Sequence, residues 1–162
     1  MVINNLQIMI LVGAPCSGKT TFARYFIRTE ENWMRLCLDD FRSMQFASGN
    51  LSKDNERLIS EIIDVAIDNL LQKHCNVLID AQHCCMEEIE RYIKRFNHLA
   101  NISFKLFDVD LETLTERCEK RFQSTGKSTS ISKLKKSYED LEELKKTFDF
   151  ETRQKIDHQE SV

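Results

Sequence analysis

The sequence predicts an α/β fold, a three-layer sandwich in which helices cover a mainly parallel sheet of four to five strands. Short apolar runs alternate with helical patterns, and this alternation implies parallel pairing through right-handed crossovers. The chain holds only four glycines and one proline, and Gly13, Pro15 and Gly18 fall within one eight-residue stretch. The 162 residues suit one domain, which we place at residues 1–150, followed by a polar tail at residues 151–162.

Four apolar runs predict buried strands, because each is short and is bounded by polar or turn residues. These runs are residues 7–12, 34–38, 77–79 and 102–109. The first of them leads directly into the stretch that holds Gly13 and Gly18.

Helical periodicity fills the segments between and after these strands. The expected helices are residues 19–28, 52–73, 86–99, 111–122 and 132–148. In the second helix the apolar residues Leu58, Ile62, Val65, Ala66 and Leu70 recur at helical spacing. Asp110 is a suitable N-cap for the fourth helix, which a polar loop at residues 124–128 follows.

The balance of charged and apolar residues excludes several classes of protein. Lys and Arg number 23 against 26 Asp and Glu, so the surface is not the basic footprint of a duplex-coating protein. Any contact with nucleic acid must therefore be local. No segment approaches the roughly 20 apolar residues of a membrane span, and residues 6–12 lack the basic leader of a signal peptide. We therefore expect a cytoplasmic protein with no membrane partner.

The six cysteines form no CxxC pair and show no regular spacing. Free thiols in a reducing cytosol are the plainest interpretation of this pattern. For the vicinal pair Cys84 and Cys85, the alternative is a redox or metal site.

Residues 13–20 match the pattern GxxxxGK[ST] and stand between a strand and a helical segment, as this phosphate-loop motif requires. Backbone N–H groups of such a loop close on a phosphate, and the N-terminus of the following helix adds positive potential. We expect Lys19 to reach the β and γ phosphates of ATP, and Thr20 to bind Mg²⁺. The expected nucleotide-binding residues of the loop are Gly13, Ala14, Pro15, Cys16, Ser17, Gly18, Lys19, Thr20 and Thr21.

Asp80 ends the apolar run at residues 77–79 and is the expected carboxylate beside the metal. The alternative is a strand-end aspartate that acts as a cap. Ala81 follows it in place of the glutamate of many water-activating ATPases, and neither DxxG nor NKxD occurs in the chain. These absences favour phosphoryl transfer to a bound acceptor over hydrolysis or a GTPase switch.

Asp39 and Asp40 follow the second predicted strand, at the edge where α/β sheets bind ligands. We expect Asp39 to take the proton of an acceptor hydroxyl and Asp40 to cap a short helix at residues 41–46. Arg42 is close enough in sequence to bind an anionic group of the acceptor. The alternative is that both aspartates only cap or turn. His83 either contacts the acceptor or is a histidine of a surface loop.

Arg117 and Arg121 are four residues apart on one predicted helix, just before the polar loop. Arginines in this place could close over the nucleotide and offset charge on the transferred phosphoryl group. The alternative is a solvated helix face on which they pair with Glu112, Glu116 and Glu119. The basic stretch at residues 117–136 suits a nucleotide lid or a nucleic-acid end, with solvated charge again as the alternative.

Four segments in this order resemble a known family: GAPCSGKTTFARYFI, LCLDDFR, VLIDAQH and FKLFDVDLETLTERCEKR. The chain resembles the kinase domain of phage polynucleotide 5′-hydroxyl kinases, within the P-loop kinase group that includes zeta-toxin-like enzymes. The likeness runs from Ile8 to Tyr138. Residues 81–83 and 122–130 depart from the family pattern.

The resemblance implies a P-loop NTPase fold with a helical lid and a role for each site residue. Lys19 and Thr20 bind phosphate and Mg²⁺, Asp80 assists the metal, and Asp39 is the general base. Arg42 then binds the acceptor, and Arg121, together with Arg117, acts on the donor phosphates from the lid. Because the chain ends early, the 3′-phosphatase domain of the best-known phage enzyme should be absent.

We therefore expect a polynucleotide 5′-hydroxyl kinase that repairs nucleic-acid ends, transferring the γ-phosphate of ATP to the 5′-OH end of RNA or DNA with Mg²⁺. One alternative is a kinase of a small-molecule hydroxyl on a nucleoside, sugar or antibiotic. Another is a nucleotide-binding module that does not turn over. The sequence leaves assembly into a homo-oligomer open, and a phage-encoded chain would work in the host cytoplasm.

Overall fold

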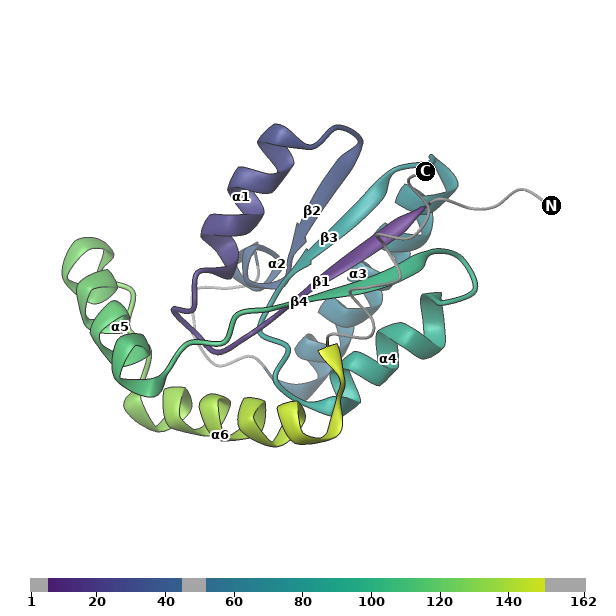
Figure 1. Cartoon of the computed structure of the whole chain (residues 1–162). Coiled ribbons are helices and arrows are strands. Elements are labelled where there is room, and N and C mark those ends of the chain that lie inside the picture. Colours follow the sequence, from purple (N-terminus) through teal and green to yellow (C-terminus); the bar gives the residue numbers. More distant parts are fainter. Residues whose placement is uncertain (1–5, 45–51, 151–162) are drawn as a thin grey trace.

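A computed structural model describes residues 6–44 and 52–150, and a parallel sheet forms its centre (Figure 1). The strands are β1 (Gln7–Val12), β2 (Trp33–Cys37), β3 (Asn76–Asp80) and β4 (Asn101–Leu106), in the spatial order β2-β3-β1-β4. Every pairing is parallel, so all four carboxyl ends lie at one edge. The predicted α/β class is confirmed, with four strands in the described part of the chain.

Helices cover both faces of this sheet (Figure 1). They are α1 (Lys19–Thr29), α2 (Leu38–Met44), α3 (Lys53–Gln72), α4 (Met86–Phe96), α5 (Leu111–Thr125) and α6 (Ile131–Thr147). Among the described residues, no helix combines the length and the apolar character needed to cross a membrane.

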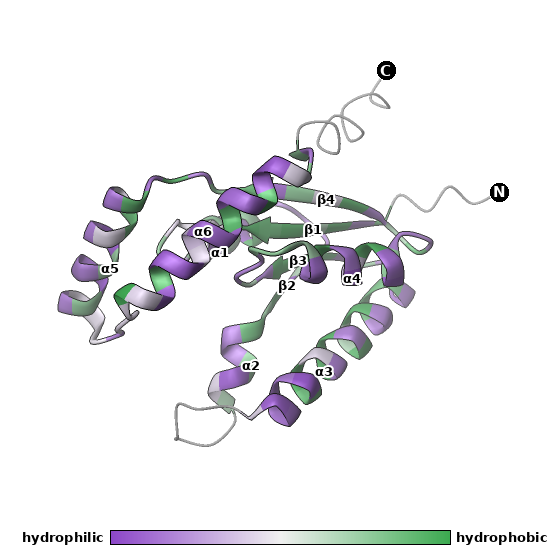
Figure 2. Cartoon of the chain, turned by 90° about the horizontal axis from the view of Figure 1, so that it is seen from below, coloured by the Kyte–Doolittle hydropathy of each residue, from purple (hydrophilic) through white to green (hydrophobic). Residues whose placement is uncertain are grey.

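Successive residues of β1 serve opposite faces of the sheet, as the period of a strand requires. Leu11 packs with Ala23 of α1 on one face. Ile8 and Ile10 join the core formed with α3 and α4 on the other face. A strand buried on both sides must be apolar throughout, and β1 is accordingly hydrophobic along its length (Figure 2).

The inner face of helix α3 is displaced from the apolar stripe that predicted the helix. Its buried residues are Ile59, Ile63, Ile67 and Leu71. Of the predicted stripe, Ala66 and Leu70 are partly buried against the core, whereas Leu58, Ile62 and Val65 are exposed. Both stripes repeat at helical spacing, so periodicity predicts the helix without choosing its inner face. Ser52 caps its first turn by accepting a hydrogen bond from the backbone N–H of Asn55.

Several predicted boundaries differ from the structure. The predicted strand at residues 102–109 ends at Leu106, and the predicted helix at residues 86–99 ends at Phe96. Strand β2 ends at Cys37 and passes without a loop into α2, so the short helix begins at Leu38 instead of residue 41. Its predicted end at residues 45–46, like the predicted tail at residues 151–162, lies outside the described residues. Helix α5 continues to Thr125, where Gly126 caps it in the left-handed region at φ 71°.

Helices α5 and α6 extend beyond the carboxyl edge of the sheet (Figure 1). The predicted cap Asp110 is confirmed, because its Oδ1 accepts from the backbone N–H of Thr113 at 2.8 Å. Leu114 of α5 and Leu134 of α6 pack on Ala14, which lies in the glycine-containing loop after β1. The other half of α6 joins the main core through Leu144. We call α5 and α6 together the lid. The lid therefore rests on the phosphate loop and is anchored in the core of the domain.

His83 is buried between β3 and α4, and its interpretation as a surface-loop histidine is wrong. Its Nδ1 lies 3.0 Å from the carbonyl oxygen of Leu11, and because a carbonyl only accepts, Nδ1 carries the proton. The imidazole meets the Tyr92 ring edge to face. A side chain so deeply buried is not placed to contact an acceptor.

Acid should destabilise the fold through His83, since burial lowers the pKa of its imidazole to about 4 from the ordinary 6.5. Between these values the unfolded chain binds a proton that the folded chain does not, so stability falls as pH falls from 6.5 to 4. In urea unfolding at pH 7.5 and pH 4.5, we expect the wild type to lose about 2 kcal/mol more than His83→Gln. Exposed His98 provides the matched control, His98→Gln. Equal pH dependence in wild type and His83→Gln would contradict this assignment.

Candidate active site

The loop between β1 and α1 is shaped around its glycines. A Cβ on Gly13 would lie 2.9 Å from the Oγ of Ser17 and 3.0 Å from the Cβ of Phe107, closer than side-chain atoms approach. Gly18 has φ 102°, which strains any other residue. The backbone therefore folds tightly at the N-terminus of α1, in the arrangement that binds anions through N–H groups.

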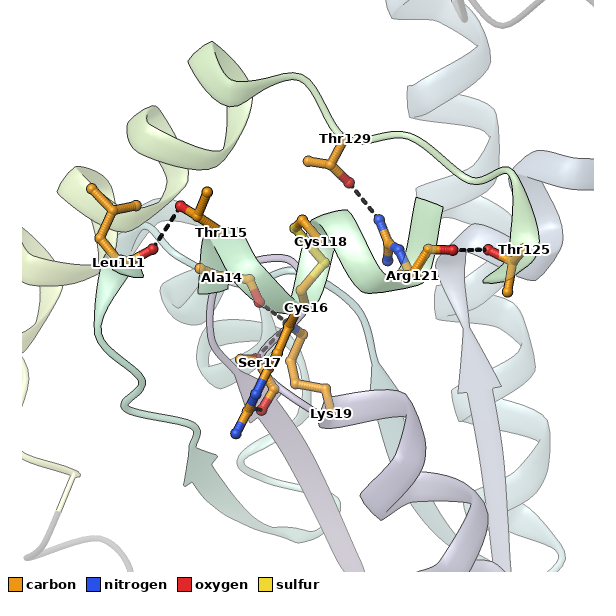
Figure 3. The surroundings of a disulfide bond; sticks show 11 residues. Ala14, Cys16, Ser17, Lys19, Leu111, Thr115, Cys118, Arg121, Thr125 and Thr129 are labelled. Atoms are coloured by element: carbon orange, nitrogen blue, oxygen red, sulfur yellow. Dashed lines mark hydrogen bonds between the residues drawn. A yellow bond between two sulfur atoms is a disulfide. The ribbon is translucent and has the colours of Figure 1, made fainter. Parts of the chain in front are cut away.

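The ammonium group of Lys19 lies inside this loop (Figure 3). Its Nζ donates to the carbonyl oxygens of Gly13 and Ala14, both at 2.7 Å, and to the Oγ of Ser17 at 3.2 Å. Burial lowers the pKa of Lys19, while the nearby carboxylates of Asp80 and Asp39 oppose that shift. A cation thus occupies the loop's concave side, where phosphate oxygens can replace the carbonyls as its acceptors.

Thr20 and Asp80 come together as predicted. β3 pairs directly with β1, so the carboxylate at its end lies beside the first turn of α1. The Oγ1 of Thr20 donates to the Oδ1 of Asp80 at 3.3 Å. A hydroxyl and a carboxylate are suitable ligands for Mg²⁺, which usually takes few protein ligands and completes its shell with phosphate and water. The two residues fit that ion.

Arg35 of β2 is a site residue that the sequence reasoning missed. Its Nε and Nη2 donate to the Oδ2 of Asp80 at 2.9 and 2.7 Å, and its Nη1 donates to Asp40 at 3.0 Å. The sequence signal for Arg35 was its position as a single arginine inside an otherwise apolar run. An arginine on a buried strand needs a buried partner. Arg35 occupies one oxygen of Asp80 and leaves the other to Thr20.

Asp39 and Asp40 both lie in the first turn of α2 and point to different partners. The prediction of Asp40 as the cap of this helix is wrong, because α2 begins at Leu38 and Asp40 lies inside the first turn, where it pairs with Arg35. Asp39 is exposed, and its Oδ1 accepts from Nη1 of Arg42 at 2.8 Å. Arg42 also donates hydrogen bonds to the carboxylate of Glu56 on α3 through Nε and Nη2, each at 2.9 Å. An acceptor's anionic group would therefore share Arg42 with two carboxylates.

The two arginines of α5 have different partners: Arg117 approaches the phosphate loop, and Arg121 bonds to the segment between α5 and α6. Nη1 of Arg117 lies 3.4 Å from the carbonyl oxygen of Ser17, and Nη2 of Arg121 donates to Oγ1 of Thr129. Within the described residues, the Nε of Arg121 is buried without a partner, and neither arginine pairs with Glu112, Glu116 or Glu119. The alternative of a solvated helix face thus has no ion pair to support it in the described residues. The buried, unpaired Nε of Arg121 is instead a donor that could bind an anion.

An open hollow of about 650 Å³ adjoins the phosphate loop. Its lining residues are Cys16, Gly18, Thr21, Phe22, Tyr25 and Arg117. It has aromatic rings from α1 on one side and a guanidinium group from α5 on the other.

The expectation of six free thiols is wrong for two of them. Cys16 of the loop forms a disulfide with Cys118 of α5, with their Cα atoms 5.7 Å apart (Figure 3). The residues are 102 positions apart, and only the folding of α5 onto the loop brings them together.

The alternative of a metal or redox site at Cys84 and Cys85 gains no support. Both are free, and burial raises the pKa of Cys84 to about 12. Across residues 6–44 and 52–150, no three His, Cys, Asp or Glu side chains are grouped to hold a metal ion.

Comparison with known proteins places the chain in a sequence family. Residues 8–144 match a family described as an AAA domain. No curated protein matches the chain significantly.

Several solved structures are similar to this one. A chain from the structure of the Pnkp1/Rnl/Hen1 RNA repair complex matches with a TM-score of 0.84 and 43% identity, over 90% of this chain and 47% of that chain. This chain thus spans about half the length of that relative. A gluconokinase from Sinorhizobium meliloti matches with a TM-score of 0.58 and 16% identity, over 85% of this chain and 75% of that one. A protein of the PezAT toxin-antitoxin system of Streptococcus pneumoniae matches at 0.61 and 16%, over 88% and 64%. These two likenesses show the fold alone.

The bond between Arg35 and Asp80 should stabilise the fold, because removal of the arginine leaves a buried carboxylate unpaired. We expect Arg35→Ala to lower the free energy of unfolding by about 3 kcal/mol in urea titrations. The matched control Arg57→Ala removes an exposed pair with Glu61 and should cost under about 0.5 kcal/mol. In the Arg35→Ala background, Asp80→Asn should recover part of the loss. Equal costs for Arg35→Ala and Arg57→Ala would refute this role.

Proposed function

Because the chain belongs to the AAA-domain family that it matches over residues 8–144, we propose that it is a polynucleotide 5′-hydroxyl kinase of the P-loop type. It transfers the γ-phosphate of ATP to the 5′-OH end of RNA or DNA. The observation that carries this proposal is the geometry of the phosphate loop, in which the buried Lys19 ammonium lies inside the loop and Thr20 donates to the carboxylate of Asp80. The 43% identity to a chain of an RNA repair complex supports a nucleic-acid end as the acceptor.

The nucleotide would bind with its phosphates in the loop. Lys19 and the backbone N–H groups of the loop hold the phosphate oxygens, and Thr20 and Asp80 would hold Mg²⁺, which neutralises charge on the phosphates. The base and sugar fit the open hollow lined by Phe22 and Arg117. Arg121 has an unpaired buried Nε to offer the transferred group.

The acceptor would enter from α2. Asp39 takes the proton of the 5′-hydroxyl as its oxygen forms the new bond to the γ-phosphorus, and the bond from that phosphorus to the bridging oxygen of ADP breaks. Arg42, which touches Asp39, binds a phosphate of the acceptor strand. With a net charge of −3, the protein holds that strand through local contacts.

A cytoplasmic location, in the host if the gene is a phage's, agrees with the four free cysteines of the described chain. Assembly into a homo-oligomer stays a prediction.

Radiolabelled ATP should label 5′-OH oligonucleotides and not the same strands carrying a 5′-phosphate. Lys19→Ala should lower this labelling by at least about 100-fold, because it removes a cation from the transferring phosphate. A parallel panel of nucleosides, sugars and antibiotics tests the small-molecule alternative. If a nucleoside, sugar or antibiotic were phosphorylated and no oligonucleotide were labelled, the proposed acceptor would be overturned. A folded protein that binds ATP and labels neither would overturn the kinase.

Substitution of Asp39 and Asp40 in turn distinguishes a general base from a carboxylate with only a structural role. Asp39→Asn should lower the transfer rate by about 100-fold or more while the Kd for ATP stays within about threefold, because a base acts only on the acceptor. The matched variant Asp40→Asn removes a charge one position away and should keep most of the rate. Steady-state labelling and calorimetric ATP titration measure the two effects. A larger loss of rate in Asp40→Asn would exchange the roles.

A further inference from the structure

The disulfide between Cys16 and Cys118 joins the two parts of the site that must both contact the nucleotide. Cys16 lies within the phosphate loop, three residues before Lys19. Cys118 lies on α5 between the lid arginines, one residue after Arg117 and three before Arg121. The bond therefore ties loop and lid together covalently at the point where the phosphates bind (Figure 3).

Cys16 adopts a backbone conformation that favours glycine. Its φ is 65°, in the left-handed region, where a side chain costs conformational energy. The neighbouring Gly18 meets a similar demand without a side chain. A thiol is thus held in the loop at an energetic cost, which is a feature expected of functional positions.

In the disulfide-bonded protein, the polar groups of the phosphate loop bond to one another. Lys19 donates to Gly13, Ala14 and Ser17 of the loop, and Arg117 lies against the carbonyl oxygen of Ser17. Binding a phosphate requires Lys19 to leave these acceptors and the loop to adjust. A covalent link from the loop to α5 opposes that adjustment, so it stabilises the self-bonded conformation relative to the nucleotide-bound one.

The disulfide lies between two hollows. Cys16 lines the open hollow beside the phosphate loop, and Cys118 of α5 lines a second hollow of about 300 Å³ between α5 and α6. Small thiols can therefore approach the bond, and attack on the Sγ of Cys16 makes Cys118 the leaving group.

We propose that Cys16 and Cys118 form a thiol–disulfide exchange site that switches nucleotide binding off when oxidised and on when reduced. In reduction, a thiolate of a dithiol attacks the Sγ of Cys16, the Cys16–Cys118 bond breaks, and Cys118 leaves as a thiolate and is protonated. The second thiol of the reagent then releases Cys16 and closes the reagent's own disulfide. Two electrons and two protons pass to the protein. Exchange with a low-molecular-weight disulfide, such as oxidised glutathione, runs the reaction backwards.

Thiol counting and nucleotide titration of the full chain test this site together. After oxidised glutathione or dithiothreitol treatment and removal of the reagent, the denatured protein should show four and six free thiols respectively. Calorimetric titration with ADP and Mg²⁺ should give a Kd at least tenfold lower for the reduced protein. Six thiols under both treatments, or one Kd for both states, would overturn the proposal.

Two variants separate the bond from general effects of oxidation. Cys118→Ser leaves the loop residue intact and should bind ADP like the reduced wild type after either treatment. Cys75→Ser removes a free, half-buried cysteine and should keep the full tenfold response. A response that persists in Cys118→Ser would assign it to other thiols and refute the site. If Cys118→Ser does not fold, the wild-type thiol count and Kd decide alone.

The ADP titration does not depend on the acceptor, so this inference and the proposed kinase fail separately. A redox-dependent Kd without labelled oligonucleotides overturns the acceptor and leaves the exchange site standing. Labelled oligonucleotides together with the same Kd for ADP in both redox states would support the kinase and overturn the exchange site.

Discussion

The site depends on one adjacency, the parallel pairing of β3 with β1. This register puts the carboxylate of Asp80 beside the first turn of α1, where Thr20 donates to it. Arg35 from the next strand fixes the other oxygen. The carboxylate at the end of β3 is therefore held by a side chain of α1 and a side chain of β2. A carboxylate held in this way is preorganised for the metal-binding role that we propose for it.

The second part of the site is built on helices and depends on packing instead of strand pairing. Leu114 and Leu134 press α5 and α6 onto Ala14 of the phosphate loop. Arg117 reaches the phosphate loop because of this small apolar cluster. In the kinase that we propose, the carboxylate and the packed lid would act on the phosphates from two sides, which matches the need of phosphoryl transfer for positioning and charge stabilisation.

Patterns that are local in sequence predicted most of the fold and half of the site. The phosphate loop, the cap Asp110 and the strand that delivers Asp80 each follow from a few neighbouring residues. Contacts between distant residues did not follow. Arg35 meets Asp80 across 45 positions and Cys16 meets Cys118 across 102, and no spacing rule links such pairs. The inner face of α3 was equally hidden, because both of its stripes are apolar.

Helix α6 makes the lid and the core one mechanical unit. At one end Leu134 touches the cluster over the loop, and at the other Leu144 sits in the main core. Just beyond it, Phe148 packs edge to face on Phe104 of β4. A helix of 17 residues is about 25 Å long, and packing at both ends fixes its position. A change in the aromatic packing under β4 would therefore be transmitted along α6 to the cluster that holds α5 against the phosphate loop.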